Sequence, residues 1–314
     1  MAKNSFEMPE IPPNSTLLEA AMAVSRELLP RPSSLTPGWC AAIASILEAT
    51  ARKPGNVSPR KSFEDLSYDE LCNAAIAIAP ILDKAATTPL GKTIRNAVTQ
   101  SQIKTRSNAN LGIIIAIVPL VAGSKSPNVF LSADGADTAI NKSDSQDALD
   151  IYAAIKQANT KSLGTRNKYD IQNAPPQSIR EAMRHAATTE PQDSIAALWG
   201  FGYQSLWDNA VSDLQNYETR AESWEQVIVN TALAQLARTP DSLITRRHGI
   251  QESLRVSSEA AALLALPEQD RFSAIEAFDW RLRHPCRINP GTTADLVAAA
   301  LYVHLWNSCF HELF

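Results

Sequence analysis

The chain has 314 residues, of which 45% are hydrophobic and 20% are charged, and its formal net charge is −4. This composition is typical of a globular protein with enough apolar residues for one core, and it favours a single domain. Because the net charge is negative, the composition excludes a general electrostatic attraction to nucleic acid or to an anionic membrane, and any anion-binding site has to be local.

Residues 1–35 are interpreted as a leader followed by a first helix, and residues 36–314 as one all-helical domain. The leader begins MAKNSFEMPEIPPNS and has polar residues and prolines where a secretory signal needs an apolar segment. The four cysteines, Cys40, Cys72, Cys286 and Cys309, are far apart and form no CxxC pair. This spacing indicates neither a disulfide framework nor a zinc module, and it favours a cytoplasmic protein.

Apolar residues recur at three- and four-residue spacing along most of the chain, and the alternation typical of strands is nearly absent. This pattern predicts an all-α fold, a single-domain array of about ten to twelve helices. The segments with this spacing are residues 15–29, 38–51, 68–86, 147–158, 178–187 and 223–237. Residues 111–123, LGIIIAIVPLVAG, are too few to cross a bilayer and contain Pro119, so they are interpreted as a buried core helix, and no membrane partner is expected.

Breaks between helices are predicted at residues 30–37, 53–62, 123–145, 160–176, 239–249 and 284–291. Residues 124–147, SKSPNVFLSADGADTAINKSDSQD, contain little apolar material and are predicted to form a surface loop. Functional residues in helical proteins are concentrated in the loops that connect the helices, so we expect the site residues in four of the polar stretches.

The first stretch is EATARKPGNVSPRKSF, residues 48–63. Its basic residues could simply stabilise the C-terminal end of the preceding helix. Alternatively, Lys53 and the neighbouring bases bind phosphate, while Glu48 acts as a base or a metal ligand.

The second stretch is TRSNANLGIIIAIVPL, residues 105–120. Asn108 or Asn110 could cap the helix that follows. Alternatively, Arg106 beside a new helix N-terminus forms a site for an anion, and Gly112 allows a close approach to the backbone.

The third stretch is RTPDSLITRRHGIQ, in which Asp241 precedes Arg246, Arg247 and His248. It could be a solvated group of charges or a phosphate site with a metal ion held by the carboxylate. The fourth, CRINPGTTADLVAAALYV, has Thr292 and Asp295 at the spacing of a capping box. Its Asn-Pro-Gly turn also suits an anionic or sugar ligand at the helix N-terminus.

In their order along the chain, EATARKPGNVSPR, SNANLGIIIAIVPLVAG, DALDIYAAIKQANTKSLG, PDSLITRRHG and INPGTTADLVAAAL resemble the triphosphoribosyl-dephospho-coenzyme A synthase family. The resemblance spans roughly residues 38–305, and its most specific parts are residues 53–56 and 289–295. It implies an all-helical enzyme that transfers the ribose of ATP, with its triphosphate attached, to the 2′-hydroxyl of dephospho-coenzyme A and releases adenine.

The resemblance also implies roles for individual residues. Glu48 and Asp295 would be the catalytic carboxylates, since displacement of adenine creates an oxocarbenium-like centre. Asp241 would hold Mg²⁺ on the triphosphate of the substrate ATP. The residues expected to bind the nucleotide and its phosphates are Lys53, Asn56, Arg106, Asn108, Asn110, Arg246, Asn289, Gly291 and Thr292.

The second motif departs from the family pattern. Members that act on coenzyme A commonly have Asn-Thr-His before the glycine, whereas this chain reads Asn108-Ala109-Asn110-Leu111-Gly112, and Lys161-Ser162 stand where glycines are common in the divergent branch that it resembles. These departures predict an acceptor other than dephospho-coenzyme A. Two alternatives stay open: ribosyl or phosphoribosyl transfer in the assembly of a tetrahydromethanopterin-type cofactor, and nucleotide binding without catalysis. A homodimer is also left open.

Two further groups of residues have simpler interpretations. A metal hydrolase built from His284, Cys286, His304, Cys309 and His311 is disfavoured, because the spacings match no zinc signature. The aromatic group Trp199, Phe201, Tyr203 and Trp207 could stack on a base, but its spacing favours the interior face of a helix.

Overall fold

The computed structural model describes residues 7–30, 35–105, 110–124, 130–158, 168–220 and 223–312, with side chains to residue 308. The described residues are mostly helical and form no β-strand beyond two isolated bridges, Ser58 with Lys61 and Phe63 with Leu66. The predicted all-α class is therefore confirmed.

The helices are α1 (Leu17–Leu28), α2 (Pro37–Thr50), α3 (Tyr68–Leu82), α4 (Leu90–Lys104), α5 (Leu111–Gly123), α6 (Ala133–Asn141), α7 (Ser145–Gln157), α8 (Ile179–Thr189), α9 (Ser194–Phe201), α10 (Gln204–Leu206), α11 (Ser212–Glu218), α12 (Trp224–Arg238), α13 (Ser242–His248), α14 (Ile250–Leu264), α15 (Glu268–Arg283) and α16 (Gly291–Glu312). A π-helical turn, Trp207–Val211, joins α10 to α11.

Within the described ranges, these helices exceed the predicted ten to twelve because short helices are difficult to recognise from periodicity. α13 lies inside the predicted break at residues 239–249. α6 lies inside the predicted surface loop, so that interpretation of residues 124–147 was wrong. Although α6 is short and polar, Ala133, Ala136 and Ile140 share one buried face. Burial of one face stabilises this nine-residue helix through tertiary contacts. The segment is too short, however, to give a clear periodic pattern in the sequence.

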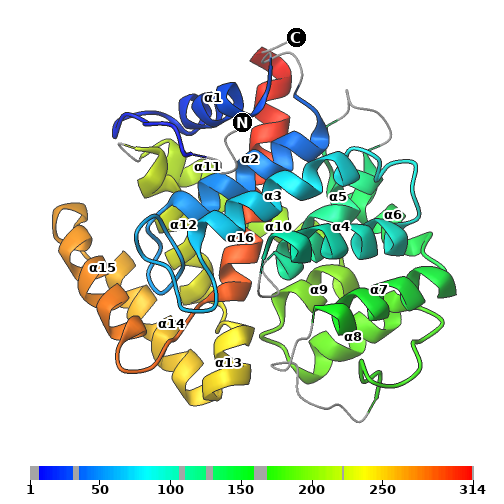
Figure 1. Cartoon of the computed structure of the whole chain (residues 1–314). Helices are drawn as coiled ribbons and strands as arrows, with labels where there is room; N and C mark the ends of the chain where they lie inside the picture. Colours follow the sequence, from blue (N-terminus) through cyan, green and yellow to red (C-terminus); the bar gives the residue numbers. More distant parts are fainter. Residues whose placement is uncertain are drawn as a thin grey trace.

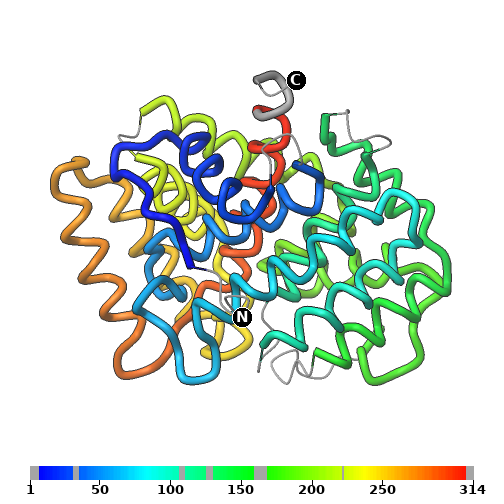
Figure 2. Tube along the Cα trace, turned by 45° about the horizontal axis from the view of Figure 1, so that its top comes forward, coloured from blue at the N-terminus to red at the C-terminus, as the bar shows by residue number. Residues whose placement is uncertain are grey.

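The long C-terminal helix α16 runs through the middle of the molecule (Figures 1 and 2). Helices α4 to α9 lie on one side of it, and α12 to α15 lie on the other (Figure 1). α16 packs directly on α2, α5 and α12. One hydrophobic cluster extends from Leu17 in α1 to Trp306 in α16, so helices from both ends of the chain share a core. In the part of the chain that the structure describes, no helix combines the length and apolar character needed to cross a bilayer.

Helix α5 has the predicted bounds and is buried along most of its length, which confirms it as a core helix. Pro119 lacks an N–H, so the carbonyl of Ile115, four residues earlier, has no partner within the helix. The indole Nε1 of Trp199 donates to this carbonyl at 3.0 Å, and the hydroxyl of Tyr203 donates to Ala116 O at 2.9 Å. Both aromatic side chains are fully buried, as the interior interpretation required, whereas Phe201 is 61% exposed.

At the N-termini of two helices, a backbone N–H donates to a carboxylate from a distant part of the chain. Asp83, which follows α3, accepts the N–H of Gly38 in α2 at 2.7 Å, and Asp147 of α7 accepts the N–H of Gly91 in α4 at 2.7 Å. Each carboxylate satisfies a backbone donor that the helix itself cannot pair. Glycine is needed at both positions, because a methyl group on Gly38 would lie 2.6 Å from Asp83 Oδ1 and one on Gly91 would overlap the backbone of Asp147.

Replacement of Asp147 by Ala should lower the free energy of unfolding by about 2 kcal/mol, because it removes the acceptor for Gly91 N–H and for the N–H of Asp144 in the capping box of α7. Urea unfolding followed by circular dichroism measures this change. The neighbouring exposed residue offers a control, since Gln146→Ala should change the same quantity by less than about 0.5 kcal/mol. Equal losses in the two variants would contradict the capping role.

Candidate functional site

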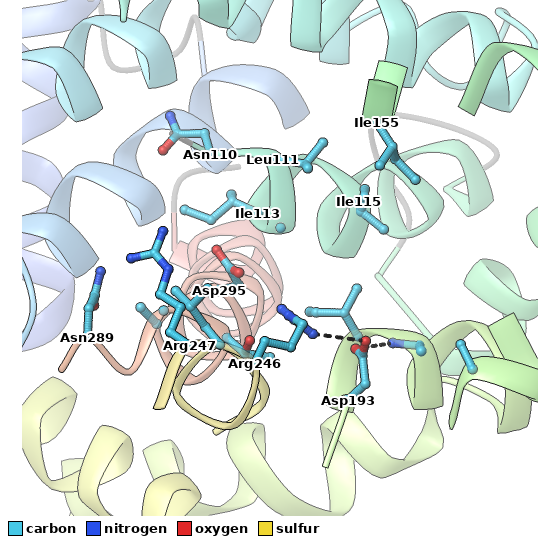
Figure 3. Close-up of a pocket in the computed structure, with 18 of the residues that line it drawn as sticks. Asn110, Leu111, Ile113, Ile115, Ile155, Asp193, Arg246, Arg247, Asn289 and Asp295 are labelled. Carbon is cyan, nitrogen blue, oxygen red and sulfur yellow. Dashed lines mark hydrogen bonds and ion pairs between the residues drawn. The ribbon is translucent and has the colours of Figure 1, made fainter. Parts of the chain in front are cut away.

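A cavity of about 290 Å³ lies where α2 ends and where α5 and α16 begin, with α7, α8, α9 and α13 completing its wall (Figure 3). All four polar stretches singled out in the sequence contribute to it. The predicted site residues that line it are Glu48, Asn56, Asn110, Arg246, Asn289, Gly291, Thr292 and Asp295. Arg106 and Asn108 lie outside the described residues.

Glu48 occupies the last turn of α2 and is buried beside Lys53. The ammonium Nζ of Lys53 lies 2.8 Å from Glu48 Oε1, and it also donates to the carbonyls of Glu48 and Ala51. These three acceptors occupy all three protons of the ammonium group. Lys53 is only 2% exposed and does not line the cavity; its ammonium group holds Glu48 in place, and its role as a phosphate ligand stays a prediction.

The Pro-Gly turn after Lys53 is bound to the segment that leads into α16. Gly55 has a φ of +75°, and its N–H donates to Asp279 Oδ1 at 2.8 Å. The amide Nδ2 of Asn56 donates to Asn289 Oδ1 at 2.7 Å. A side chain on Gly55 would lie 2.7 Å from the carbonyl of Ile288, so this close contact requires glycine. The turn therefore positions Asn289 at the edge of the cavity.

Asp279, which receives the Gly55 N–H, is itself held by two cations. Lys61 Nζ lies 2.9 Å from Oδ2, and Arg283 Nε lies 2.8 Å from Oδ1. Burial acts to raise the pKa of this carboxyl, but the hydrogen bonds from Lys61 and Gly55 and the charge of Arg283 outweigh it, and the pKa is lowered. An ionised Asp279 thus anchors the turn at neutral pH.

Asp295 is recessed at the N-terminus of α5. Its carboxyl accepts the backbone N–H of Ile113, and a methyl group on Gly112 would overlap Oδ2. Burial raises the pKa of Asp295 well above its ordinary value, and the negative charges of Glu48 and Asp241 raise it further. The capping box predicted for Thr292 and Asp295 was wrong, because α16 already begins at Gly291 and Asp295 serves a different helix.

Asp241 is the N-cap of α13 and is 2% exposed. Its Oδ1 accepts from the backbone N–H groups of Leu243 and Ile244, at 2.8 and 3.1 Å. Its Oδ2 accepts from the N–H and hydroxyl of Thr293, at 2.8 and 2.9 Å. Four protein donors therefore occupy both oxygens. This arrangement differs from the metal ligand predicted from the sequence, because the carboxylate joins the starts of α13 and α16 behind the cavity.

Three arginines face the cavity, and two of them were not among the predicted ligands. Arg246 approaches Asp193 with an Nη1–Oδ2 distance of 3.4 Å (Figure 3). Arg287 pairs with Asp65 and lies over the ring of Phe63, 3.8 Å from its centroid. The Nε atoms of Arg246 and Arg287 are buried and have no hydrogen-bond partner among the described residues.

Arg247 has no hydrogen bond or ion pair with any residue in the described ranges, and it extends toward the middle of the cavity (Figure 3). Partial burial lowers its pKa, and the positive charges of Arg287 and Arg246 lower it further. Arg247 stands in the Arg-Arg run of α13, and Arg287 stands two residues before Asn289, so both lay inside recognised motifs. Asp193 lay in none, and only its spatial position identifies it.

Asn110 has a left-handed backbone, with a φ of 66°, and its side chain does not cap α5 as predicted. Its Nδ2 donates instead to the carbonyl of Leu71 at 3.3 Å. This bond places the amide beside Leu111 at the start of α5, on the same side of the cavity as Ile113 (Figure 3). Asn110 therefore presents a polar group to the cavity rather than to its own helix.

Part of the cavity wall is apolar. Side chains from α5, α7, α8 and α9 form it, and they are Ile113, Ile115, Tyr152, Ile155, Ile179, Met183, Ala186 and Ala196. Three arginines, two carboxylates and a hydrocarbon wall therefore line one cavity. This combination suits a ligand with an anionic part and an apolar part.

No group of three or more His, Cys, Asp or Glu side chains able to hold a metal ion occurs in the part of the chain that the structure describes. His304 pairs with Glu218, with an Nε2–Oε2 distance of 2.9 Å, and His284 stacks on Trp280. The side chains of Cys309 and His311 lie outside the described residues. His304 is buried, whereas His284 lies at the surface.

Comparison with known proteins relates the fold and the motifs to one family. Residues 34–312 match the family model of ATP:dephospho-CoA triphosphoribosyl transferase. The crystal structure of a provisionally assigned triphosphoribosyl-dephospho-coA synthase from Archaeoglobus fulgidus is similar to 74% of this chain and 97% of its own, with a TM-score of 0.57 and 21% identity. At that identity the structural likeness shows a shared fold. No curated protein matches the chain.

Replacement of Gly112 by Ala should lower the free energy of unfolding by about 1–3 kcal/mol, because the added methyl group would overlap the Asp295 carboxyl. Urea unfolding measures the loss. In an Asp295→Ala background the same methyl group has room, so the second substitution should cost markedly less there. Strictly additive losses would show that Gly112 and Asp295 are not in contact.

Proposed function

Since this chain belongs to the ATP:dephospho-CoA triphosphoribosyl transferase family, we propose that its cavity binds ATP and transfers the triphosphoribosyl group to an acceptor hydroxyl, with release of adenine. The single observation that supports this most directly is the combination of groups that line one cavity. Arginine donors without partners among the described residues, two carboxylates and an apolar wall match a polyphosphate, a reacting sugar and an organic body.

The arginine end suits the triphosphate. Arg246 and Arg287 each have a buried Nε without a partner, and Arg247 has no ion pair among the described residues. A buried donor that lacks an acceptor is costly, and phosphate oxygens are its strongest partners. Asp193 and Asp65 each hold one of the outer arginines in place and leave Arg247 free to meet the ligand.

The carboxylate region suits the ribose. Cleavage of the bond from the anomeric carbon to adenine develops positive charge on the sugar, and a nearby carboxylate stabilises that charge or takes the proton of the attacking hydroxyl. Glu48 and Asp295 both line this region. The amides of Asn110 and Asn289 are placed to bind sugar hydroxyls, and Asn56 orients the second of them.

Magnesium does not fit a protein site here. The described residues offer no cluster of metal-ligating side chains, and the carboxylate predicted to hold the ion, Asp241, already accepts four hydrogen bonds. Magnesium ions are commonly bound by substrate phosphates and water with one or two carboxylates. We therefore assign no protein residue and no step to this ion.

The acceptor is either dephospho-coenzyme A, named in the family description, or a different hydroxyl compound. The second candidate is favoured by the departure of Asn108-Ala109-Asn110 from the Asn-Thr-His of the members that act on coenzyme A, since Asn110 lines the cavity. In that case the reaction is ribosyl or phosphoribosyl transfer in the assembly of a tetrahydromethanopterin-type cofactor.

Pure protein incubated with ATP, Mg²⁺ and dephospho-coenzyme A should release adenine, detected by chromatography. Adenine release that requires a pterin precursor in place of dephospho-coenzyme A would select the second candidate. Tight ATP binding without adenine release from any acceptor would contradict the proposed transfer and favour a nucleotide-binding protein.

Replacement of Arg247 by Gln should weaken ATP binding by about 10- to 100-fold in isothermal titration calorimetry, because it removes a charged hydrogen bond to phosphate. Binding of adenosine, which has no phosphate, should change much less. Arg255→Gln is the matched control, since Arg255 lies on the surface of α14 and pairs only with Glu252 and Glu259 among the described residues. An equal loss of adenosine binding would place Arg247 away from the phosphates.

A further inference from the structure

The two carboxylates of the cavity have opposite surroundings. Glu48 has a buried ammonium group 2.8 Å from its Oε1, whereas Asp295 has no ion pair within the described ranges. Asp295 instead accepts a backbone N–H from Ile113. A pair of neighbouring carboxyl groups in unlike environments can divide acid and base roles at one pH.

We infer that Glu48 acts in its ionised form as the base for the acceptor hydroxyl, that Lys53 is the positioning residue that keeps it ionised, and that Asp295 acts in its protonated form as the acid for the departing adenine. This division of roles rests on the proposed triphosphoribosyl transfer.

The ionised state of Glu48 follows from the burial of its partner. Lys53 is 2% exposed, and its three protons are shared among Glu48 Oε1 and two backbone carbonyls. An uncompensated buried ammonium would be strongly unfavourable, so its one anionic partner has to keep its charge. The other groups that face Glu48 are Asp295 of α16 and the thiol of Cys72 in α3.

The protonated state of Asp295 follows from the charged and polar groups that face it from α2, α5 and α13. Glu48 of α2 and Asp241 at the start of α13 are negative, while Arg246 of α13 is positive but already approaches Asp193. The Ile113 N–H of α5 favours a charge on Asp295, yet burial and the two negative neighbours outweigh it and raise the pKa. A neutral carboxyl can still accept that N–H on its carbonyl oxygen and donate its O–H to a ligand.

The transfer balances with these two groups alone. The acceptor oxygen forms a bond to the anomeric carbon while its proton passes to Glu48. The bond from that carbon to N9 of adenine breaks, the electron pair stays on adenine, and a ring nitrogen of adenine takes the proton of Asp295. Adenine leaves neutral. Return of the proton from Glu48 to Asp295 through solvent restores the starting state.

The test compares purine release from ATP and from 7-methyl-ATP, whose cationic base leaves without gaining a proton. The acceptor is the one, dephospho-coenzyme A or a pterin precursor, with which the wild-type protein releases adenine. Asp295→Asn should lower kcat for ATP by about 100-fold or more, but for 7-methyl-ATP by less than about 10-fold. Glu48→Gln should lower kcat for both nucleotides by about 100-fold. Equal losses for both nucleotides in Asp295→Asn, or rescue of Glu48→Gln by the methylated nucleotide, would overturn the assignment.

Lys53 is tested by the pH profile. Lys53→Met removes the ammonium group that pairs with Glu48 at 2.8 Å and so destabilises the carboxylate, and it should move the acid limb of kcat/KM upward by about one pH unit or more. An unmoved acid limb would overturn the positioning role. If this variant fails to fold, the neutral pair Glu48→Gln with Lys53→Met should fold and match the activity of Glu48→Gln alone. A double variant far less active than Glu48→Gln would also count against the role.

Failure of the two proposals can be told apart. Wild-type protein that releases no purine from either nucleotide, with dephospho-coenzyme A or with a pterin precursor as acceptor, overturns the proposed transfer, and this division of roles with it. If the wild-type protein releases purine but Asp295→Asn lowers kcat equally for the two nucleotides, only the division of roles is overturned.

Discussion

The site depends above all on the insertion of one carboxyl group into the start of another helix. Asp295 of α16 accepts the Ile113 N–H across Gly112, where no larger residue fits. This contact fixes the first turn of α5 against α16, the helix at the centre of the molecule (Figure 1). Because α5 also forms part of the apolar wall, the same contact holds this wall against α16.

The same interaction, in which a carboxylate accepts backbone N–H groups, occurs at several other places in the molecule. Asp83, Asp147 and Asp241 each accept backbone N–H groups at the start of a helix, and Asp279 does the same for the turn at Gly55. Buried carboxyl groups usually destabilise a fold, but Asp147, Asp241 and Asp279, which are buried, each satisfy backbone donors that would otherwise lack partners. The arrangement also has a chemical consequence, because burial raises the pKa of Asp241 and Asp295. The contacts that build the fold thereby supply a carboxyl group of altered acidity at the cavity.

The charges around the cavity form two separate systems. Glu48 and Lys53 make a closed pair beneath the sugar region, while Arg246, Arg247 and Arg287 retain donors for a ligand. The proposed binding of a polyanion is compatible with a net charge of −4, because the attraction comes from arginines that line one cavity and not from the overall charge. The lysine of the Lys-Pro-Gly-Asn motif belongs to the first system, and the Arg-Arg run of α13 belongs to the second.

The sequence by itself determined the all-helical class, the bounds of α5 and the motifs that meet at the cavity, because apolar periodicity and Pro-Gly turns are local properties of the chain. Eight predicted residues line the cavity for this reason. Only the tertiary structure decided where side chains point. It turned Lys53 inward to Glu48, engaged Asp241 with Thr293, and brought Asp193 to Arg246. Each of those contacts joins groups whose pairing depends on how helices pack, and residue type does not encode that packing.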